Sequence, residues 1–124
     1  MKKLLYIFLP ALLLVACYSQ ERNCADFKTG KFRFETTIDG KTQITELTRT
    51  DSLQTETYNG KTTQASVRWL NDCEFVLKDL EATTKEEKES IHMKILTTKD
   101  NTATVEYSIV GDTHKQKGTV TKLN

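Results

Sequence analysis

Hydrophobic and polar residues alternate along most of this 124-residue chain after residue 29, and turn signals interrupt the alternation about every ten residues. The strongest signals are Asp39-Gly40 and Asn59-Gly60, because a type I′ hairpin turn needs positive φ at both central positions. Between the turns the chain is rich in Thr, Val, Ile and aromatic residues, without helical periodicity. The pattern predicts eight strands, at 30–38, 41–50, 53–58, 61–70, 73–79, 90–98, 102–110 and 113–121.

Eight strands in sequence predict an all-β fold, a single antiparallel meander that forms either an up-and-down, lipocalin-like barrel or a strongly curled sheet. The domain is expected to cover residues 24–124. The longest connection is 80–89, where Thr84-Lys85-Glu86-Glu87 matches a capping box. A helical turn and a solvated loop are both consistent with that segment.

Turn lengths predict which side chains share the inner face, because a register slip of one residue would reverse every side chain. Two-residue turns place Phe32 opposite Leu47, and three-residue loops at 70–72 and 99–101 place Trp69 opposite Cys73 and Ile95 opposite Val105. The expected inner face is apolar and consists of Phe32, Phe34, Ile38, Leu47, Trp69, Phe75, Leu77, Ile91, Met93, Ile95, Val105, Tyr107 and Ile109. Phe34, Leu47, Trp69 and Tyr107 are the candidate lining of an interior cavity, although Trp69 is expected chiefly as the central core aromatic.

The same register places Arg49, Gln54 and Glu56 on the apolar face. Buried charges are costly unless they are paired and hydrogen-bonded, so these three side chains are expected to satisfy one another, with Arg49 diagonal to Glu56. They could form a structural polar bridge, or a slipped register could leave them in water. The functional alternative is a polar spot inside a ligand cavity.

The first residues have the three parts of a secretory signal: basic Lys2 and Lys3, an apolar stretch from Leu4 to Val15, and small Ala16. The sequence Leu14-Val15-Ala16-Cys17 resembles the bacterial lipobox, which implies cleavage before Cys17 and attachment of lipid to its thiol. We therefore expect a signal peptide at 1–16, a lipidated tether at 17–23 and a cell-envelope location, at the outer membrane. The simpler alternative is an ordinary signal peptide with a chance cysteine.

Removal of residues 1–16 leaves 16 Lys and Arg against 17 Asp and Glu, a formal charge of −1. Nucleic-acid binding needs a concentrated basic surface, so no nucleic-acid partner is expected. Cys24 and Cys73 form an even pair in an exported chain, which is typical of a disulfide. Two buried thiols or a metal site are the alternatives, but His92 and His114 lack ligand spacing with either cysteine, and we predict no metal and no cofactor.

Several phrases of the sequence together resemble a known family. They are Cys24–Phe32 (CADFKTGKF), Arg49–Gln54 (RTDSLQ), Arg68–Phe75 (RWLNDCEF), His92–Leu96 (HMKIL) and Val110–Gly118 (VGDTHKQKG). The family consists of short lipoproteins from Bacteroidetes-type bacteria that often carry the label DNA topoisomerase IV. The position of Phe75 is usually tyrosine there. The resemblance implies no biochemical role, and the label does not fit an exported chain of this length without a basic face.

The sequence carries no phosphate-binding glycine loop, nucleophile elbow or zinc-protease motif, and an enzyme is not expected. The remaining hypotheses are a binding module and a structural or accessory envelope protein with a filled barrel. The binding module would hold a small apolar or amphipathic ligand or dock an envelope protein. A void lined by the four candidate cavity residues would favour a ligand.

Overall fold

The turn residues adopt the conformations that the sequence predicts. Both positions of Asp39-Gly40 and of Asn59-Gly60 have positive φ, as a type I′ turn requires. The computed structural model describes residues 22–85 and 88–124. Its strands are β1 (Gly30–Ile38), β2 (Lys41–Arg49), β3 (Leu53–Tyr58), β4 (Lys61–Asn71), β5 (Glu74–Asp79), β6 (Ile91–Lys99), β7 (Thr102–Ile109) and β8 (Gln116–Lys122).

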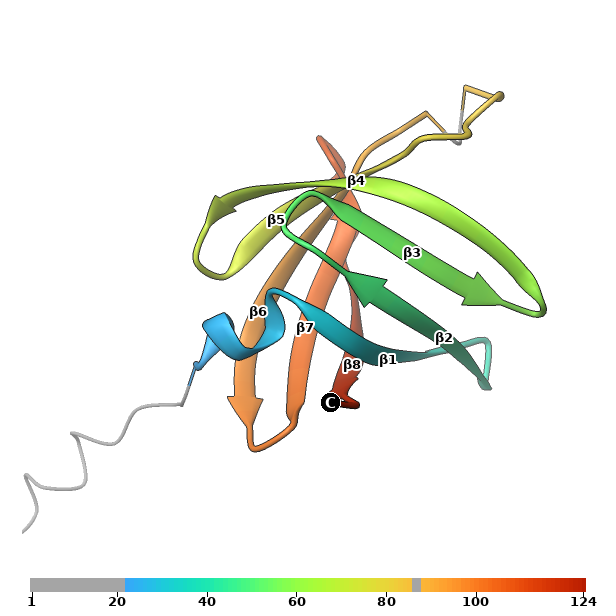
Figure 1. Ribbon diagram of the computed structural model, residues 1–124. Coiled ribbons are helices and arrows are strands. Elements are labelled where there is room, and N and C mark those ends of the chain that lie inside the picture. The colour runs from blue at the N-terminus through green and yellow to red at the C-terminus, as the bar shows by residue number, and fades with distance from the viewer. Residues whose placement is uncertain (1–21, 86–87) are drawn as a thin grey trace, which may run out of the picture.

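The eight strands form a closed antiparallel up-and-down barrel in sequence order (Figure 1). Closure comes from the pairing of β1 with β8, in which Phe32 lies opposite Lys122 and Phe34 opposite Val120. Every strand therefore has a neighbour on both sides, which leaves no unpaired sheet edge. The predicted fold class is confirmed in its closed form.

Most of the predicted registers are confirmed, including Phe32 opposite Leu47 and Ile95 opposite Val105. The prediction was wrong between β4 and β5, where Trp69 pairs with Phe75 instead of Cys73. The ladder shifts between Trp69 and Asn71, so a bulge at this point and a tighter turn replace the expected three-residue loop. The displacement of two residues preserves the inner face, because side chains alternate with a period of two.

Three further details differ from the expectation. A three-residue loop was expected at 99–101. The extra residue lies instead in a bulge between Ile95 and Thr97, and Lys99 pairs with Thr102 across a tighter turn. Strand β8 begins at Gln116, so residues 113–115 do not extend it. Ile38 has the parity of the inner face but is 42% exposed, because it lies beside the β1–β2 turn, beyond the packed part of the barrel.

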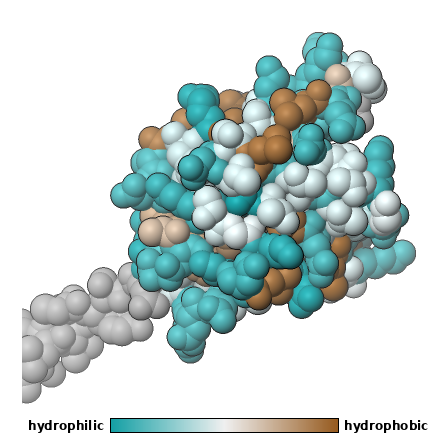
Figure 2. All heavy atoms as spheres, viewed as in Figure 1, coloured by the Kyte–Doolittle hydropathy of each residue, from teal (hydrophilic) through white to brown (hydrophobic). Residues whose placement is uncertain are grey.

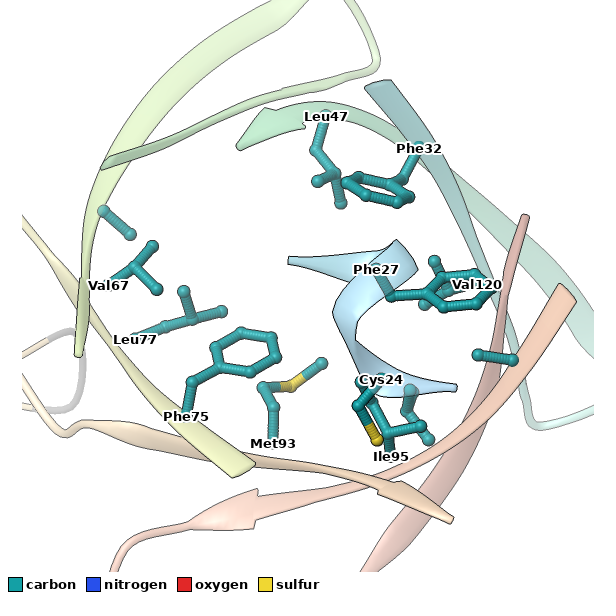
Figure 3. Packing of buried hydrophobic residues seen from close by; sticks show 13 residues of the cluster. Cys24, Phe27, Phe32, Leu47, Val67, Phe75, Leu77, Met93, Ile95 and Val120 are labelled. Carbon is teal, nitrogen blue, oxygen red and sulfur yellow. The ribbon is translucent and has the colours of Figure 1, made fainter. Parts of the chain in front are cut away.

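A short 3-10 helix, η3 (Cys24–Phe27), closes one end of the barrel, and we call it the plug. Figure 3 shows the plug within the ring of strands, with Phe27 pointing among the core side chains. The Phe27 ring stacks on Phe32 with 6.1 Å between centroids, and both side chains are almost fully buried. The buried apolar core consists of Cys24, Phe27, Phe32, Leu47, Ala65, Val67, Phe75, Leu77, Met93, Ile95, Ala103, Val105 and Val120.

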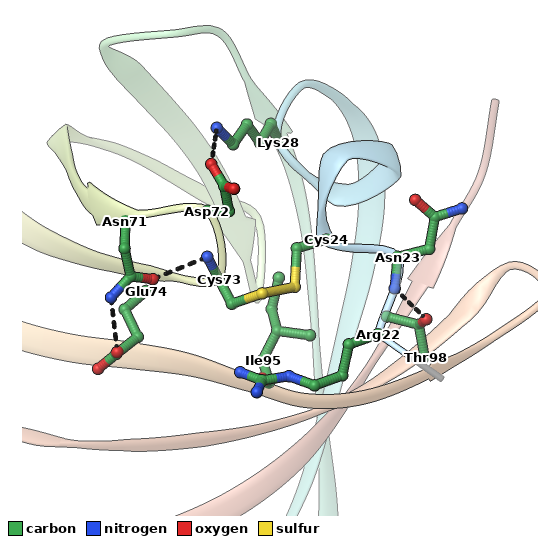
Figure 4. Close-up of a disulfide and its surroundings, with 10 residues drawn as sticks. All are labelled: Arg22, Asn23, Cys24, Lys28, Asn71, Asp72, Cys73, Glu74, Ile95 and Thr98. Carbon is green, nitrogen blue, oxygen red and sulfur yellow. Dashed lines mark hydrogen bonds and ion pairs between the residues drawn. A yellow bond between two sulfur atoms is a disulfide. The ribbon is translucent and has the colours of Figure 1, made fainter. Parts of the chain in front are cut away.

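A disulfide between Cys24 and Cys73 fastens the plug to the turn that follows β4 (Figure 4). The backbone N–H of Asn23 donates to Oγ1 of Thr98 at 2.7 Å, and Arg22 donates to the carbonyl of Ile95 at 3.1 Å. Arg22 and Asn23, the last two residues of the expected 17–23 tether, are therefore bound to the barrel. The expected signal peptide 1–16 and Cys17 lie outside the described residues. No helix in the described ranges is long and apolar enough to cross a membrane.

Phe34 occupies the space beside Gly118 on β8. A Cβ atom at Gly118 would lie 2.6 Å from Cε1 of Phe34 and 2.9 Å from the carbonyl oxygen of Glu35. The Phe34 ring also meets Tyr107 edge to face, with 5.5 Å between centroids. A glycine at position 118 thus allows β1 and β8 to close the barrel around an interior aromatic ring.

Replacement of both Cys24 and Cys73 by serine should lower the free energy of unfolding by about 2–4 kcal/mol, because the bridge closes a long loop in the unfolded chain. The cysteines are 49 residues apart. Urea unfolding measures the loss, and the wild-type protein in reductant should reproduce it. Equal stability with and without the bridge would contradict a role in fastening the plug.

Gly118→Ala should lower the free energy of unfolding by about 1–3 kcal/mol, because the added methyl group must displace the Phe34 ring or the Glu35 backbone. Exposed Lys117→Ala is the matched control and should change stability by less than about 0.5 kcal/mol. The loss at Gly118 should be smaller when Phe34 is alanine. Wild-type stability for Gly118→Ala would refute the close contact.

Candidate functional site

The barrel encloses a cavity of about 230 Å³ above the plug. Its wall combines aliphatic and aromatic side chains with one short polar strip and consists of Phe34, Thr45, Leu47, Arg49, Gln54, Glu56, Leu77, Ile91, Met93, Tyr107 and Val120. Two groups of residues that the sequence singled out separately, the polar cluster and three of the four cavity candidates, therefore meet in one cavity. By contrast, the space among Arg49, Phe27 and Phe75 is almost filled, with a void of about 10 Å³.

Of the two roles considered for Trp69, the structure supports the core position: the residue packs against the hydrophobic core and does not line the cavity. Its ring packs on Phe75 with 4.5 Å between centroids, while the Lys28 ammonium lies 5.1 Å from the ring centre. Trp69 lies next to the β4–β5 turn, at the same barrel end as the plug. Phe75 is almost fully buried, so its ring takes the interior position beside Trp69.

Arg49 forms the floor of the cavity. Its Nη1 donates to the carbonyl oxygen of Phe27 in the plug at 2.6 Å, and its Nε donates to Oε1 of Gln54 at 2.9 Å. The guanidinium carbon lies 4.9 Å from the ring centre of Phe32 and 4.6 Å from that of Phe75. Two hydrogen bonds and two aromatic rings thus fix the guanidinium, which suits a planar group that stacks on aromatic faces.

The Arg49 side chain carries its charge in an apolar environment. Burial lowers the pKa of Arg49 from its ordinary value to about 10, and the negative charge of Glu56 opposes this change. Desolvation disfavours the charged form of any base, which explains the direction. Because the pKa remains well above neutral pH, the guanidinium is a cation inside the barrel under ordinary conditions.

Gln54 links Arg49 to Glu56. Its Nε2 donates to Oε2 of Glu56 at 3.0 Å while its Oε1 accepts from Arg49. The expectation that the three polar side chains satisfy one another is confirmed, and so is the diagonal placement of Arg49 and Glu56, which are joined by a chain of hydrogen bonds through the Gln54 amide. Gln54 is almost fully buried, whereas Glu56 is partly exposed and lies further from the plug along β3.

The barrel end opposite the plug is formed by the turns at 39–40 and 59–60 and by residues 80–85, 88–90 and 110–115, and we call it the mouth. A hollow of about 240 Å³ lies at the mouth and shares Ile91 and Tyr107 with the interior cavity. His114 and Gln116 are on its wall. The Tyr107 hydroxyl lies 3.0 Å from Oγ1 of Thr36, which ties the Tyr107 ring on β7 to β1, on the other side of β8.

A second polar group lies outside the barrel. Nε2 of His92 is 2.9 Å from Oε1 of Glu74, and Asn71 donates to Oε2 of the same carboxylate at 2.8 Å. The Asn71 hydrogen bond, aided by His92, lowers the pKa of Glu74 against a small opposing effect of burial. Within the described ranges, no group of three or more His, Cys, Asp or Glu side chains is arranged to hold a metal ion.

Comparisons with protein-family models, with curated proteins and with solved structures find no match to this chain.

Substitutions at Gln54 and at Glu56 should lower the stability of the protein by unequal amounts. Gln54→Leu leaves Nε of Arg49 without an acceptor and should cost about 1–3 kcal/mol of stability, which is the penalty for an unsatisfied buried donor. Glu56→Ala should cost less than about 1 kcal/mol, since a partly exposed carboxylate without direct contact to Arg49 contributes little. Urea unfolding of both variants measures the difference. A larger loss for Glu56→Ala would indicate that the carboxylate, and not the amide, supports the guanidinium.

Proposed function

We propose that this chain is a lipid-anchored envelope protein whose barrel binds a small ligand with an apolar body. The observation that carries the proposal is the cavity of about 230 Å³, with its mainly apolar wall and its single polar strip. Few polar groups in an apolar concavity are the usual composition of a small-molecule site. A filled barrel would gain stability from closing such a space, because voids in a core are destabilising.

The size of the cavity limits the ligand. Drug-sized ligands occupy cavities of about 300–1,000 Å³, so this interior suits a smaller molecule. At the packing density of protein interiors, one methylene group takes on the order of 25 Å³. A space of about 230 Å³ then accommodates about nine non-hydrogen atoms. A longer molecule would extend past Tyr107 into the hollow at the mouth.

The proposed anchor would orient the barrel. Support for it comes from the resemblance of Leu14–Cys17 to a lipobox and from the resemblance of the chain to short envelope lipoproteins. Arg22 is bound at the plug end, and the five residues from Cys17 to Arg22 can span at most about 18 Å. The plug end would then face the membrane and the mouth would face away from it, so that ligands enter from the aqueous side.

We propose binding without catalysis. The polar groups on the cavity wall besides the hydroxyls are Arg49, Gln54 and Glu56. A general acid and base pair needs two groups that exchange protons near neutral pH. Arg49, whose pKa is about 10, stays protonated, and the amide of Gln54 does not titrate.

An accessory role through protein contact is the second candidate. Four large hydrophobic residues lie exposed next to the turns and loops of the mouth: Ile38, Tyr58, Leu80 and Val110. Elsewhere hydrophobic residues form small groups between polar ones on the face that Figure 2 shows. Exposed apolar residues at one end of a barrel suit the docking of an envelope protein.

The direct test of ligand binding uses residues 18–124, which contain every strand, the plug and the disulfide. We expect 1-octanol to bind, with perturbation of the methyl resonances of Leu77, Ile91 and Met93 in NMR spectra. Leu47→Trp fills the cavity and should weaken binding at least tenfold. Ile44→Trp is the matched control, because Ile44 lies on the outer face of the same strand and is half-exposed; it should bind as the wild type does.

Native mass spectrometry of the same segment, expressed in the periplasm, supplies a second test. A small molecule that copurifies with the wild type and with Ile44→Trp, but not with Leu47→Trp, would identify the ligand. If 1-octanol failed to bind and no molecule copurified in repeated preparations, ligand binding would be refuted in favour of the accessory role.

A further inference from the structure

We infer that the cavity selects ligands whose polar end is a carboxylate, held by the guanidinium of Arg49, with an apolar chain lying along Leu47, Leu77 and Met93. This inference rests on the proposed ligand-binding function and names the chemical class of the ligand. The observation behind it is a buried cation on the cavity wall without a carboxylate partner.

Arg49 is 4% exposed, yet it takes part in none of the ion pairs among the described residues. Fully buried arginines are usually paired with an anion, because the loss of hydration is otherwise uncompensated. The two acceptors of Arg49, the Phe27 carbonyl and the Gln54 amide, are both neutral. The positive charge is therefore solvated directly by dipoles and aromatic faces, and the carboxylate of Glu56 acts on it only through Gln54 and not by direct contact.

The hydrogen-bonding capacity of the guanidinium is also incomplete. A guanidinium has five N–H donors. Nε uses its one N–H for Gln54 and Nη1 uses one of its two for Phe27. Within the described part of the chain, Nη2 has no hydrogen-bond acceptor. The remaining N–H groups of Nη1 and Nη2 suit the two oxygens of a carboxylate, which arginine binds in this fork geometry.

The fixed orientation of Arg49 favours recognition over a merely structural role. Phe32 and Phe75 pack against the guanidinium and the plug carbonyl holds it in place, so little conformational entropy remains to be lost when an anion binds. The low polarity of the wall strengthens the attraction between the two charges. A carboxylate at this point would neutralise the positive charge of Arg49.

Glu56 is the group that opposes an anionic ligand. It lies on the same wall, but Gln54 stands between it and Arg49, and its partial exposure gives it access to water. The carboxylate of Glu56 is thus a modest repulsive charge nearer the mouth. Glu56→Gln removes this charge and keeps the shape of the side chain, so it should tighten the binding of a carboxylate.

The volume of the cavity indicates the length of the chain. Octanoate has eight carbons and two oxygens, which is close to the capacity of about nine non-hydrogen atoms derived above. With the carboxylate on Arg49, an eight-carbon chain would fill the apolar part of the cavity. Octanoate is therefore the matched probe. Octylamine and 1-octanol have chains of the same length but a different charge.

The test titrates residues 18–124 with the three probes by isothermal calorimetry at pH 7. We expect octanoate to bind at least tenfold more tightly than 1-octanol, and octylamine to bind most weakly. Arg49→Met should remove the preference for octanoate, so that octanoate and 1-octanol bind this variant with affinities within about threefold of each other. Glu56→Gln should strengthen octanoate binding several-fold and should not change 1-octanol binding.

The wild-type comparison alone decides the inference if Arg49→Met does not fold. Equal affinity for octanoate and 1-octanol would overturn the carboxylate assignment while leaving ligand binding intact. A preference for octylamine would also overturn it and would make Glu56 the recognition group. If none of the three probes bound, both this inference and the proposed function would fail.

Discussion

The hydrogen bond from the Arg49 guanidinium to the Phe27 carbonyl joins the barrel to the segment that closes one of its ends. A barrel of eight strands has an interior just wide enough for side chains to fill, and this one is filled at one end only. Phe27 and Cys24 occupy the plugged end, and Arg49 separates them from the cavity. Without that contact the plug would depend on the disulfide, on the packing of Phe27 and on the contacts of Arg22 and Asn23.

Burying Arg49 carries a desolvation cost, as the lowered pKa of this side chain indicates. An apolar residue of similar volume would avoid this cost, and the plug could pack against it directly. The guanidinium instead stacks on Phe32 and Phe75 and forms part of the wall of the cavity. A costly charge next to an empty apolar space is the combination expected of a binding site, because proteins keep such features where function requires them.

Barrel closure and cavity size depend on each other. The Phe34 ring lies over Gly118 and against Tyr107, so the strand pair that closes the barrel also carries the part of the cavity wall nearest the mouth. The disulfide and the contacts of Arg22 and Asn23 hold the other end. The cavity thus lies between two tightly packed regions, with the partly exposed Glu56 and the rim hollow on the side of the mouth.

The strands, the inner face and the pairing of Cys24 with Cys73 followed from the sequence alone, because turn chemistry and a period of two are local properties. The polar cluster of Arg49, Gln54 and Glu56 was also predicted, since correct registers brought it to one face. Phe27 was missed because a single aromatic residue before the first strand has no periodic neighbours to mark it. Only the tertiary structure placed Trp69 outside the cavity and Ile38 in solvent, because bulges and barrel ends decide which inward side chains meet. The empty volume was likewise beyond the sequence, since it depends on how far side chains from opposite walls reach toward each other.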